Sequence, residues 1–153
     1  QYNHVRVAEY AKTLRDRGVG VHIGAHGQRE GLAAHWDMWI MTQGGFTPWE
    51  AIRGATIDGA KHLGMDKDIG SIESGKLADM VVIDGDVLSD ISRSEHVTYT
   101  VLNGRVYESA TMNELGSKKK RNEFFFEDDN QQFMPKETEA EMQAKAERHH
   151  WVH

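Results

Sequence analysis

The feature that most constrains this chain is one short apolar run placed between two helical patterns. Residues 19–23 are apolar apart from a glycine and a histidine and end at Gly24, which is typical of a buried β-strand. Residues 5–17 before them and 32–43 after them carry apolar side chains at helical spacing. A single strand of a parallel sheet cannot complete its hydrogen-bond ladder. The pattern therefore predicts one α/β unit of a larger sheet, and we expect the chain to be a fragment or a processed product.

The next segment carries a strong helix-start signal. Thr47 can cap a helix, Pro48 suits the first helical position, and Glu50 completes a capping box. We expect this helix to continue to about residue 63, with Gly64 as its C-terminal stop.

Beyond Gly70 the pattern changes from helices to strands. Residues 78–84 and 97–102 are rich in the side chains that favour β-structure. The dipeptide at residues 103–104 is Asn-Gly, the best short hairpin signal in the chain. Residues 105–107 are predicted to form the returning strand.

The charge and the composition exclude several classes of function. The 153 residues carry 18 Lys and Arg against 24 Asp and Glu, a net charge of −6, which argues against a nucleic-acid or acidic-membrane partner. No cysteine is present, so disulfides and thiolate metal sites are excluded. No apolar run reaches the roughly 18 residues of a membrane span. The compartment stays open between the cytoplasm and the periplasm or secretion, because a signal peptide would lie upstream.

The C-terminal end is polar and charged. We expect the basic block at residues 118–121 to be a solvated surface, and residues 135–150 to form a charged helix.

Among nine histidines, His26 is the best candidate for chemistry. It follows the predicted buried strand, in a glycine-rich loop before a helix. Ligand sites of parallel α/β folds lie at the C-terminal ends of strands, where an imidazole can bind metal or move protons. The alternative is that His26 only hydrogen-bonds the loop backbone. His22 lies within the apolar run and is more typical of a core residue than of a ligand.

Five further residues near His26 have both a functional and a structural interpretation. Gln28 and Arg29 share its loop and could hold a substrate carboxylate or carbonyl, or could simply be solvated. His35, Trp36 and Trp39 lie on the following helix, where a His-Trp pair could line a pocket. Large aromatic residues at helical spacing are more often packing residues.

Four segments carry a resemblance to a known family. Residues 47–56 (TPWEAIRGAT) and 59–65 (GAKHLGM) resemble the helix after the eighth barrel strand of the amidohydrolase superfamily, and its continuation. Residues 69–83 (IGSIESGKLADMVVI) resemble the passage that returns to the small β-sandwich beside that barrel. Residues 101–107 (VLNGRVY) resemble the closing hairpin of the sandwich. Read together, residues 24–107 resemble the C-terminal part of that superfamily, and this span is somewhat over half of the chain.

The resemblance implies an α/β fold: the C-terminal part of a (β/α)8 TIM-like barrel plus part of a small composite β-sandwich. Residues 1–68 would be the last barrel strand and its helices, residues 69–108 the C-terminal sandwich strands, and residues 109–153 a polar, partly helical tail. Residues 24–36 (GAHGQREGLAAHW) are most similar to the imidazolonepropionase-related and peptidase-like branch. Some members of that branch carry a TolB-like β-propeller ahead of the hydrolase domain.

The resemblance also implies a mechanism for the parent enzyme. One or two divalent metals, commonly zinc, activate water that attacks an amide or related C–N bond. Many members use an Asp at the end of the eighth strand as acid/base, in a Gly-Thr-Asp sequence that is Gly-Ala-His at residues 24–26 here. His26 therefore aligns with that Asp, as a metal ligand, a substitute base or a substrate contact. Asp37 lies too deep in the following helix to replace it. We expect substrate binding by Gln28, Arg29 and His35.

The remaining metal ligands of the family have no match in these 153 residues. A metal site needs three or four ligands, and His26 is one candidate. We therefore expect a divalent metal, zinc by resemblance, bound mainly by residues absent from this chain, and an inactive isolated chain. The expected partners are the remainder of the parent amidohydrolase, a small-molecule or peptide-like substrate, and further copies in a homo-oligomer. The alternative function is a non-catalytic assembly segment that completes or binds another polypeptide. A small metal-binding module is disfavoured by the spacing of the histidines.

Overall fold

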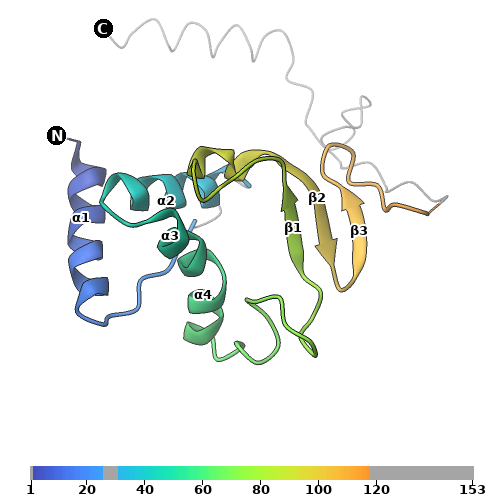
Figure 1. Cartoon of the computed structure of the whole chain (residues 1–153), viewed down its shortest axis with the longest axis horizontal. Helices are drawn as coiled ribbons and strands as arrows, with labels where there is room; N and C mark the ends of the chain where they lie inside the picture. The colour runs from blue at the N-terminus through green and yellow to red at the C-terminus, as the bar shows by residue number, and fades with distance from the viewer. Residues whose placement is uncertain (1, 26–30, 118–153) are drawn as a thin grey trace, which may run out of the picture. The chain divides into compact units, whose positions relative to one another are not determined.

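The computed structural model describes residues 2–25 and 31–117. Its elements, labelled in Figure 1, are α1 (Asn3–Asp16), α2 (Leu32–Gln43), α3 (Pro48–Ala55), α4 (Ile57–His62), β1 (Met80–Ile83), the 3-10 helix η1 (Ile91–Glu95), β2 (Val97–Leu102) and β3 (Arg105–Glu108). The described part is therefore α/β with one small sheet. None of its helices is long and apolar enough to cross a membrane. The predicted tail helix and the basic block lie outside the described residues.

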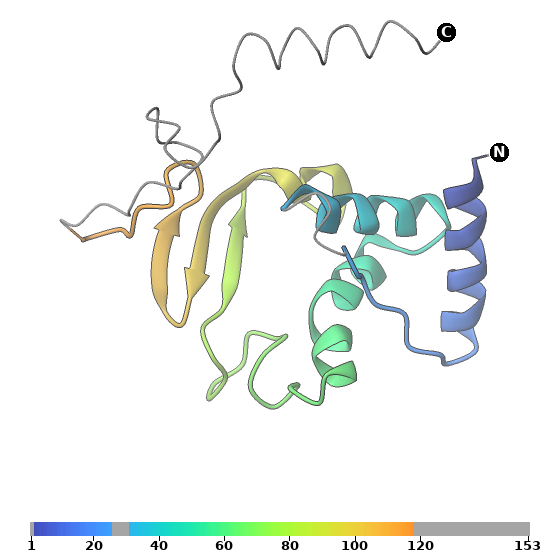
Figure 2. The ribbon, with the colours of Figure 1, turned by 180° about the vertical axis from the view of Figure 1, so that it is seen from behind.

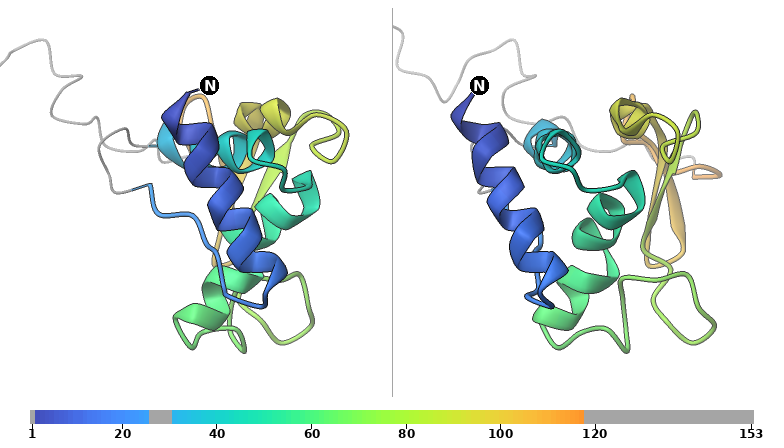
Figure 3. Two further views of the ribbon diagram at one scale, coloured as in Figure 1. Left: turned by 90° about the vertical axis from the view of Figure 1, so that its left-hand side faces the viewer. Right: turned by 60° about the vertical axis from the view of Figure 1, so that its left-hand side comes forward.

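Helix α2 is the centre of the helical layer. It contacts α1, α3 and η1, and Figures 1 and 2 show it between α1 on one side and η1 on the other. Figure 3 shows that α3 lies between α2 and α4. The buried core consists of Met38 and Met41 from α2, together with Phe46 and Ala51. The face of α2 that carries the two methionines thus organises the layer.

The strand predicted at residues 19–23 is corrected by the structure, because residues 19–25 form neither helix nor strand. A strand exists only through its ladder of hydrogen bonds, and no other strand of the described residues pairs with this segment. The apolar pattern still reports burial, since Val21 and Ile23 pack against the core cluster.

The capping box is confirmed. The backbone N–H of Glu50 donates to Thr47 Oγ1 at 3.2 Å, and the N–H of Thr47 donates to Glu50 Oε2 at 2.8 Å. The single helix predicted to reach residue 63 is wrong, because the chain breaks at Thr56 into α3 and α4. Thr56 leaves the helical region (φ −129°, ψ −106°), and its hydroxyl donates to the Ile52 carbonyl at 2.7 Å. A side chain that bonds the preceding turn in this way competes with the helix.

The sheet is an antiparallel meander in the order β1-β2-β3. Asn103 and Gly104 join β2 to β3, both with positive φ (49° and 78°), which is the conformation that a two-residue hairpin turn requires. The Asp79 carboxylate accepts a hydrogen bond from the Asn103 N–H at 2.6 Å. The Asn-Gly prediction is confirmed, and the predicted strands lie where the sequence places them, with β1 shorter than expected.

Gly44→Ala tests the close approach between α1 and the end of α2. A methyl group at Gly44 would overlap the Ala8 side chain and lie 2.8 Å from the Glu9 backbone nitrogen. Because backbone has to move, we expect a loss of about 1–3 kcal/mol in the free energy of unfolding, measured with urea. Gly24→Ala is the matched control, since nothing described lies within 4 Å of its added methyl group. Equal losses in both variants would contradict the contact.

The Glu50 carboxylate predicts a pH dependence of stability. The Thr47 backbone hydrogen bond, assisted by the Thr47 hydroxyl and by Lys12 and Arg15, lowers the pKa of Glu50 below its ordinary value of 4.5. A depressed folded-state pKa adds stability above the unfolded-state value, and this stability is lost as the pH falls through the folded-state pKa. Glu50→Gln keeps an acceptor at the cap but removes the charge. We expect it to lower the unfolding free energy near pH 7, and we expect its difference from the unsubstituted chain to shrink as the pH falls below 4.5. A difference that is independent of pH would contradict this cause.

Candidate functional site

His35, Trp39 and Ser94 form a hydrogen-bonded cluster between α2 and η1. His35 Nδ1 lies 3.1 Å from Ser94 Oγ, and Trp39 Nε1 donates to the same oxygen at 3.0 Å. Trp39 Nε1 also lies 3.0 Å from the carbonyl oxygen of Ile91. Ser94 is 2% exposed, whereas His35 is half-buried. The two helical side chains are four residues apart and therefore share one face of α2.

A second face of α2 holds the end of the 19–25 segment. Asp37 Oδ2 accepts a hydrogen bond from the Gly24 N–H at 3.0 Å. Asp37, which lies too deep in the helix to replace the family's acid/base, thus has a structural partner. This hydrogen bond holds Gly24 beside α2. Gly24 precedes the glycine-rich loop in sequence, and Asp37 follows it.

His35 is the one predicted site residue that the structure describes. His26, Gln28 and Arg29 lie outside the described residues, so their roles stay predictions. The interpretation of Trp39 as a packing residue is compatible with the structure, since it contacts the core cluster, yet its indole nitrogen is also committed to η1. No local pattern in the sequence singles out Ser94.

The described residues do not form a metal site. No group of three or more His, Cys, Asp or Glu side chains converges within the described ranges 2–25 and 31–117. His22 and His62 come together, with ring centroids 4.9 Å apart, and the buried His22 Nδ1 has no hydrogen-bond partner among these residues. Two imidazoles fall short of the three or four ligands that a metal site needs. The donor set of the described residues therefore does not fit a resident metal.

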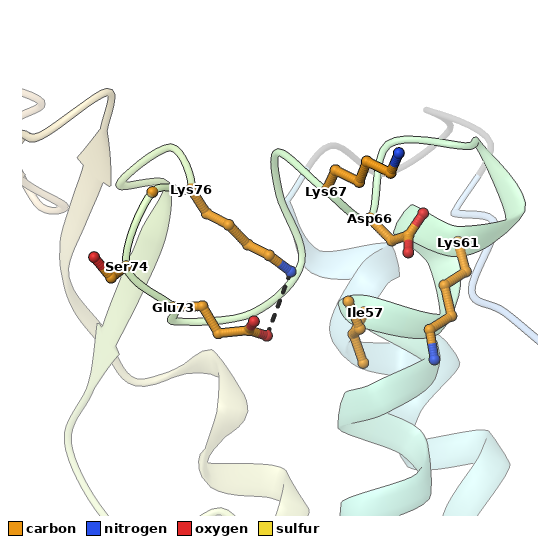
Figure 4. Close-up of a pocket in the computed structure, with 8 residues that line it drawn as sticks. Ile57, Lys61, Asp66, Lys67, Glu73, Ser74 and Lys76 are labelled. Atoms are coloured by element: carbon orange, nitrogen blue, oxygen red, sulfur yellow. Dashed lines mark ion pairs between the residues drawn. The ribbon is translucent and has the colours of Figure 1, made fainter.

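A hollow of about 540 Å³ lies beside α4 and the turn that precedes β1. Figure 4 shows Lys76 directed toward Glu73, its partner at 3.4 Å, while Lys61 and Lys67 point in different directions. The ammonium groups do not converge on one point, and none of the predicted site residues lines this hollow. It is therefore not the candidate site.

Comparison with known proteins decides the family. The model of the Amidohydrolase family matches residues 2–107. The chain belongs to the amidohydrolase family. Membership implies a TIM-barrel fold, and this family is generally metal-dependent.

The relatives of this amidohydrolase chain carry names that refer to different substrates. It is 41% identical over 69 residues to a 5-methylthioadenosine/S-adenosylhomocysteine deaminase of Thermoanaerobacter pseudethanolicus, covering 37% of this chain and 16% of that enzyme. It is 35% identical over 82 residues to an imidazolonepropionase of Symbiobacterium thermophilum, covering 50% and 19%. The structure matches a Xaa-Pro dipeptidase with bound methionine at a TM-score of 0.62 and 31% identity, covering 67% and 26%. The chain thus spans about a sixth to a quarter of the length of these relatives.

Trp39→Phe tests the cluster between α2 and η1. Phenylalanine keeps the ring but removes the donor to Ser94 and to the Ile91 carbonyl, so two acceptors lose a partner. We expect a loss of about 1–3 kcal/mol in the free energy of unfolding. The control is Trp36→Phe at a tryptophan that is 39% exposed, with an expected change within about 0.5 kcal/mol. Similar urea midpoints for all three proteins would contradict a contribution from these bonds.

Proposed function

We propose that this chain supplies the C-terminal part of a hydrolase that acts on C–N bonds of an amide, a cyclic amide or a dipeptide-like compound. The family match over residues 2–107 carries the proposal. The names of its relatives support the reaction class, since they are a deaminase, an imidazolonepropionase and a dipeptidase. These enzymes share hydrolysis at a carbon–nitrogen bond and differ in substrate.

Within this function we assign the chain a share of the active site rather than the whole of it. His26 would act as acid/base or as a single metal ligand, and Gln28, Arg29 and His35 would bind the substrate. A divalent metal, zinc by family resemblance, would be held mainly by residues of the parent enzyme outside this chain. Within the ranges 2–25 and 31–117, no three metal-ligating side chains come together.

Several large apolar side chains of the described residues are exposed. Leu63 is 68% exposed, Val81 53% and Leu102 58%. The remainder of the amidohydrolase would cover them, and a homo-oligomer is the next partner we propose.

The test compares the longest natural polypeptide that carries these residues with the 153-residue chain alone. We expect the long polypeptide to hydrolyse at least one member of a panel of Xaa-Pro dipeptides, cyclic amides and adenine nucleosides. Removal of metal with a chelator should abolish this activity, and added zinc should restore it. The 153-residue chain should show no hydrolysis.

Two outcomes would contradict the proposal. Metal-dependent hydrolysis by the 153-residue chain alone would show that the assigned division of ligands is wrong. A long polypeptide that binds neither metal nor substrate analogues of this panel, and that hydrolyses no member of the panel, would favour the non-catalytic assembly function instead.

A further inference from the structure

Ser94 is a polar residue that the structure buries almost completely, with 2% of its surface exposed. Its hydroxyl oxygen meets Trp39 Nε1 and His35 Nδ1, which come from residues 55 and 59 positions away in the sequence. Within the described part of the chain these two contacts are the hydrogen bonds of the Ser94 hydroxyl. The cluster joins the helical layer to the segment that connects β1 with β2.

The direction of the two hydrogen bonds follows from the hydrogens available. An indole Nε1–H can only donate, so Ser94 Oγ accepts from Trp39. The hydroxyl carries one hydrogen of its own, which needs an acceptor. If His35 Nδ1 also carried a hydrogen, the oxygen would face two donors and its own hydrogen would be left without a described partner. Buried donors without a partner are rare and costly.

We infer that Ser94 is a positioning residue that fixes neutral His35 as the Nε2–H tautomer, so that His35 offers a hydrogen-bond donor to a substrate oxygen. His35 Nδ1 accepts from the Ser94 hydroxyl, and Nε2 makes no hydrogen bond within the described residues. The first half of this inference stands on the geometry alone. The second half rests on the proposed function, in which His35 binds the substrate.

The substrate group that suits such a donor is a carbonyl or carboxylate oxygen. A neutral imidazole with its hydrogen on Nε2 donates there and cannot accept. His35 lies in the first turn of α2, the helix that follows the loop of His26 in sequence. Ser94 is held in its own turn by the Asp90 side chain, which accepts from the Ser92 N–H at 3.0 Å. A residue of η1 thus sets the chemistry that a residue of α2 presents.

The first experiment measures the tautomer without any activity. Long-range ¹H–¹⁵N spectra of the 153-residue chain at about pH 8.5, above the ordinary imidazole range, should show the His35 hydrogen on Nε2. His35→Gln assigns the signals. In Ser94→Ala the Nδ1–H form should become populated, because its Nδ1 has lost the donor. Ser92→Ala is the control, since that exposed hydroxyl contacts Asp90 on the same turn. The inference would be overturned if the unsubstituted 153-residue chain carried the His35 hydrogen on Nδ1. It would also be overturned if the Ser94→Ala chain gave the same spectrum as the unsubstituted chain.

The second experiment measures kinetics in the long polypeptide. Ser94→Ala should raise KM about three- to tenfold, because the substrate loses one well-placed hydrogen bond. The value of kcat should change less than about twofold. Ser92→Ala should leave both unchanged. A fall in kcat at constant KM, or no change at all, would overturn the substrate-binding half. A parent polypeptide with no hydrolytic activity would overturn the proposed function, while the tautomer measured by NMR would still decide the role of Ser94.

Discussion

The burial of one face of α2 is the contact on which the rest of the described structure depends. Met38 and Met41 project from that face into the core with Phe46 and Ala51, and α1, α3 and η1 each contact the same helix. Few side chains besides these are buried in the described residues. Because so little apolar surface is removed from water, each of these contacts carries a large share of the stabilisation.

The other faces of α2 hold the candidate site. Helical periodicity places His35 and Trp39 together against Ser94, while Asp37 points elsewhere and binds the Gly24 N–H. The core methionines, the hydrogen-bonded cluster and the anchor of the 19–25 segment therefore belong to one rigid element. A change that rotates α2 to suit the core would also move His35, so the packing and the site are coupled by geometry.

The relation between α2 and η1 also bears on how an amidohydrolase is assembled. A barrel active site is built from loops that follow several strands, and this chain spans only a sixth to a quarter of the relatives it matches. Under the proposed function, its contribution to that site is partial. It contains a contact, through Ser94, between α2 and η1, the short helix that connects β1 with β2. Orientation of His35 is thus shared between two regions that the sequence separates.

The sequence by itself determined the features whose causes lie within a few residues. The bounds of α2 and β2, the Thr47–Glu50 capping box and the Asn103–Gly104 turn follow from periodicity, hydrogen bonding and allowed backbone angles. The family resemblance was also readable in local motifs. These features require no knowledge of where distant segments lie.

Tertiary structure alone decided the rest. Residues 19–25 are not a strand here because strand formation depends on a paired neighbour, which no local pattern supplies. At the helix break, the Thr56 hydroxyl donates to the Ile52 carbonyl. Such a side-chain bond competes with the regular helical hydrogen bonds of the backbone, and the tertiary surroundings decide between them. Ser94 meets His35 across 59 residues, so its importance is invisible in the chain around it. Local backbone preferences act over a few residues, whereas burial and side-chain hydrogen bonds act between whichever residues folding brings together.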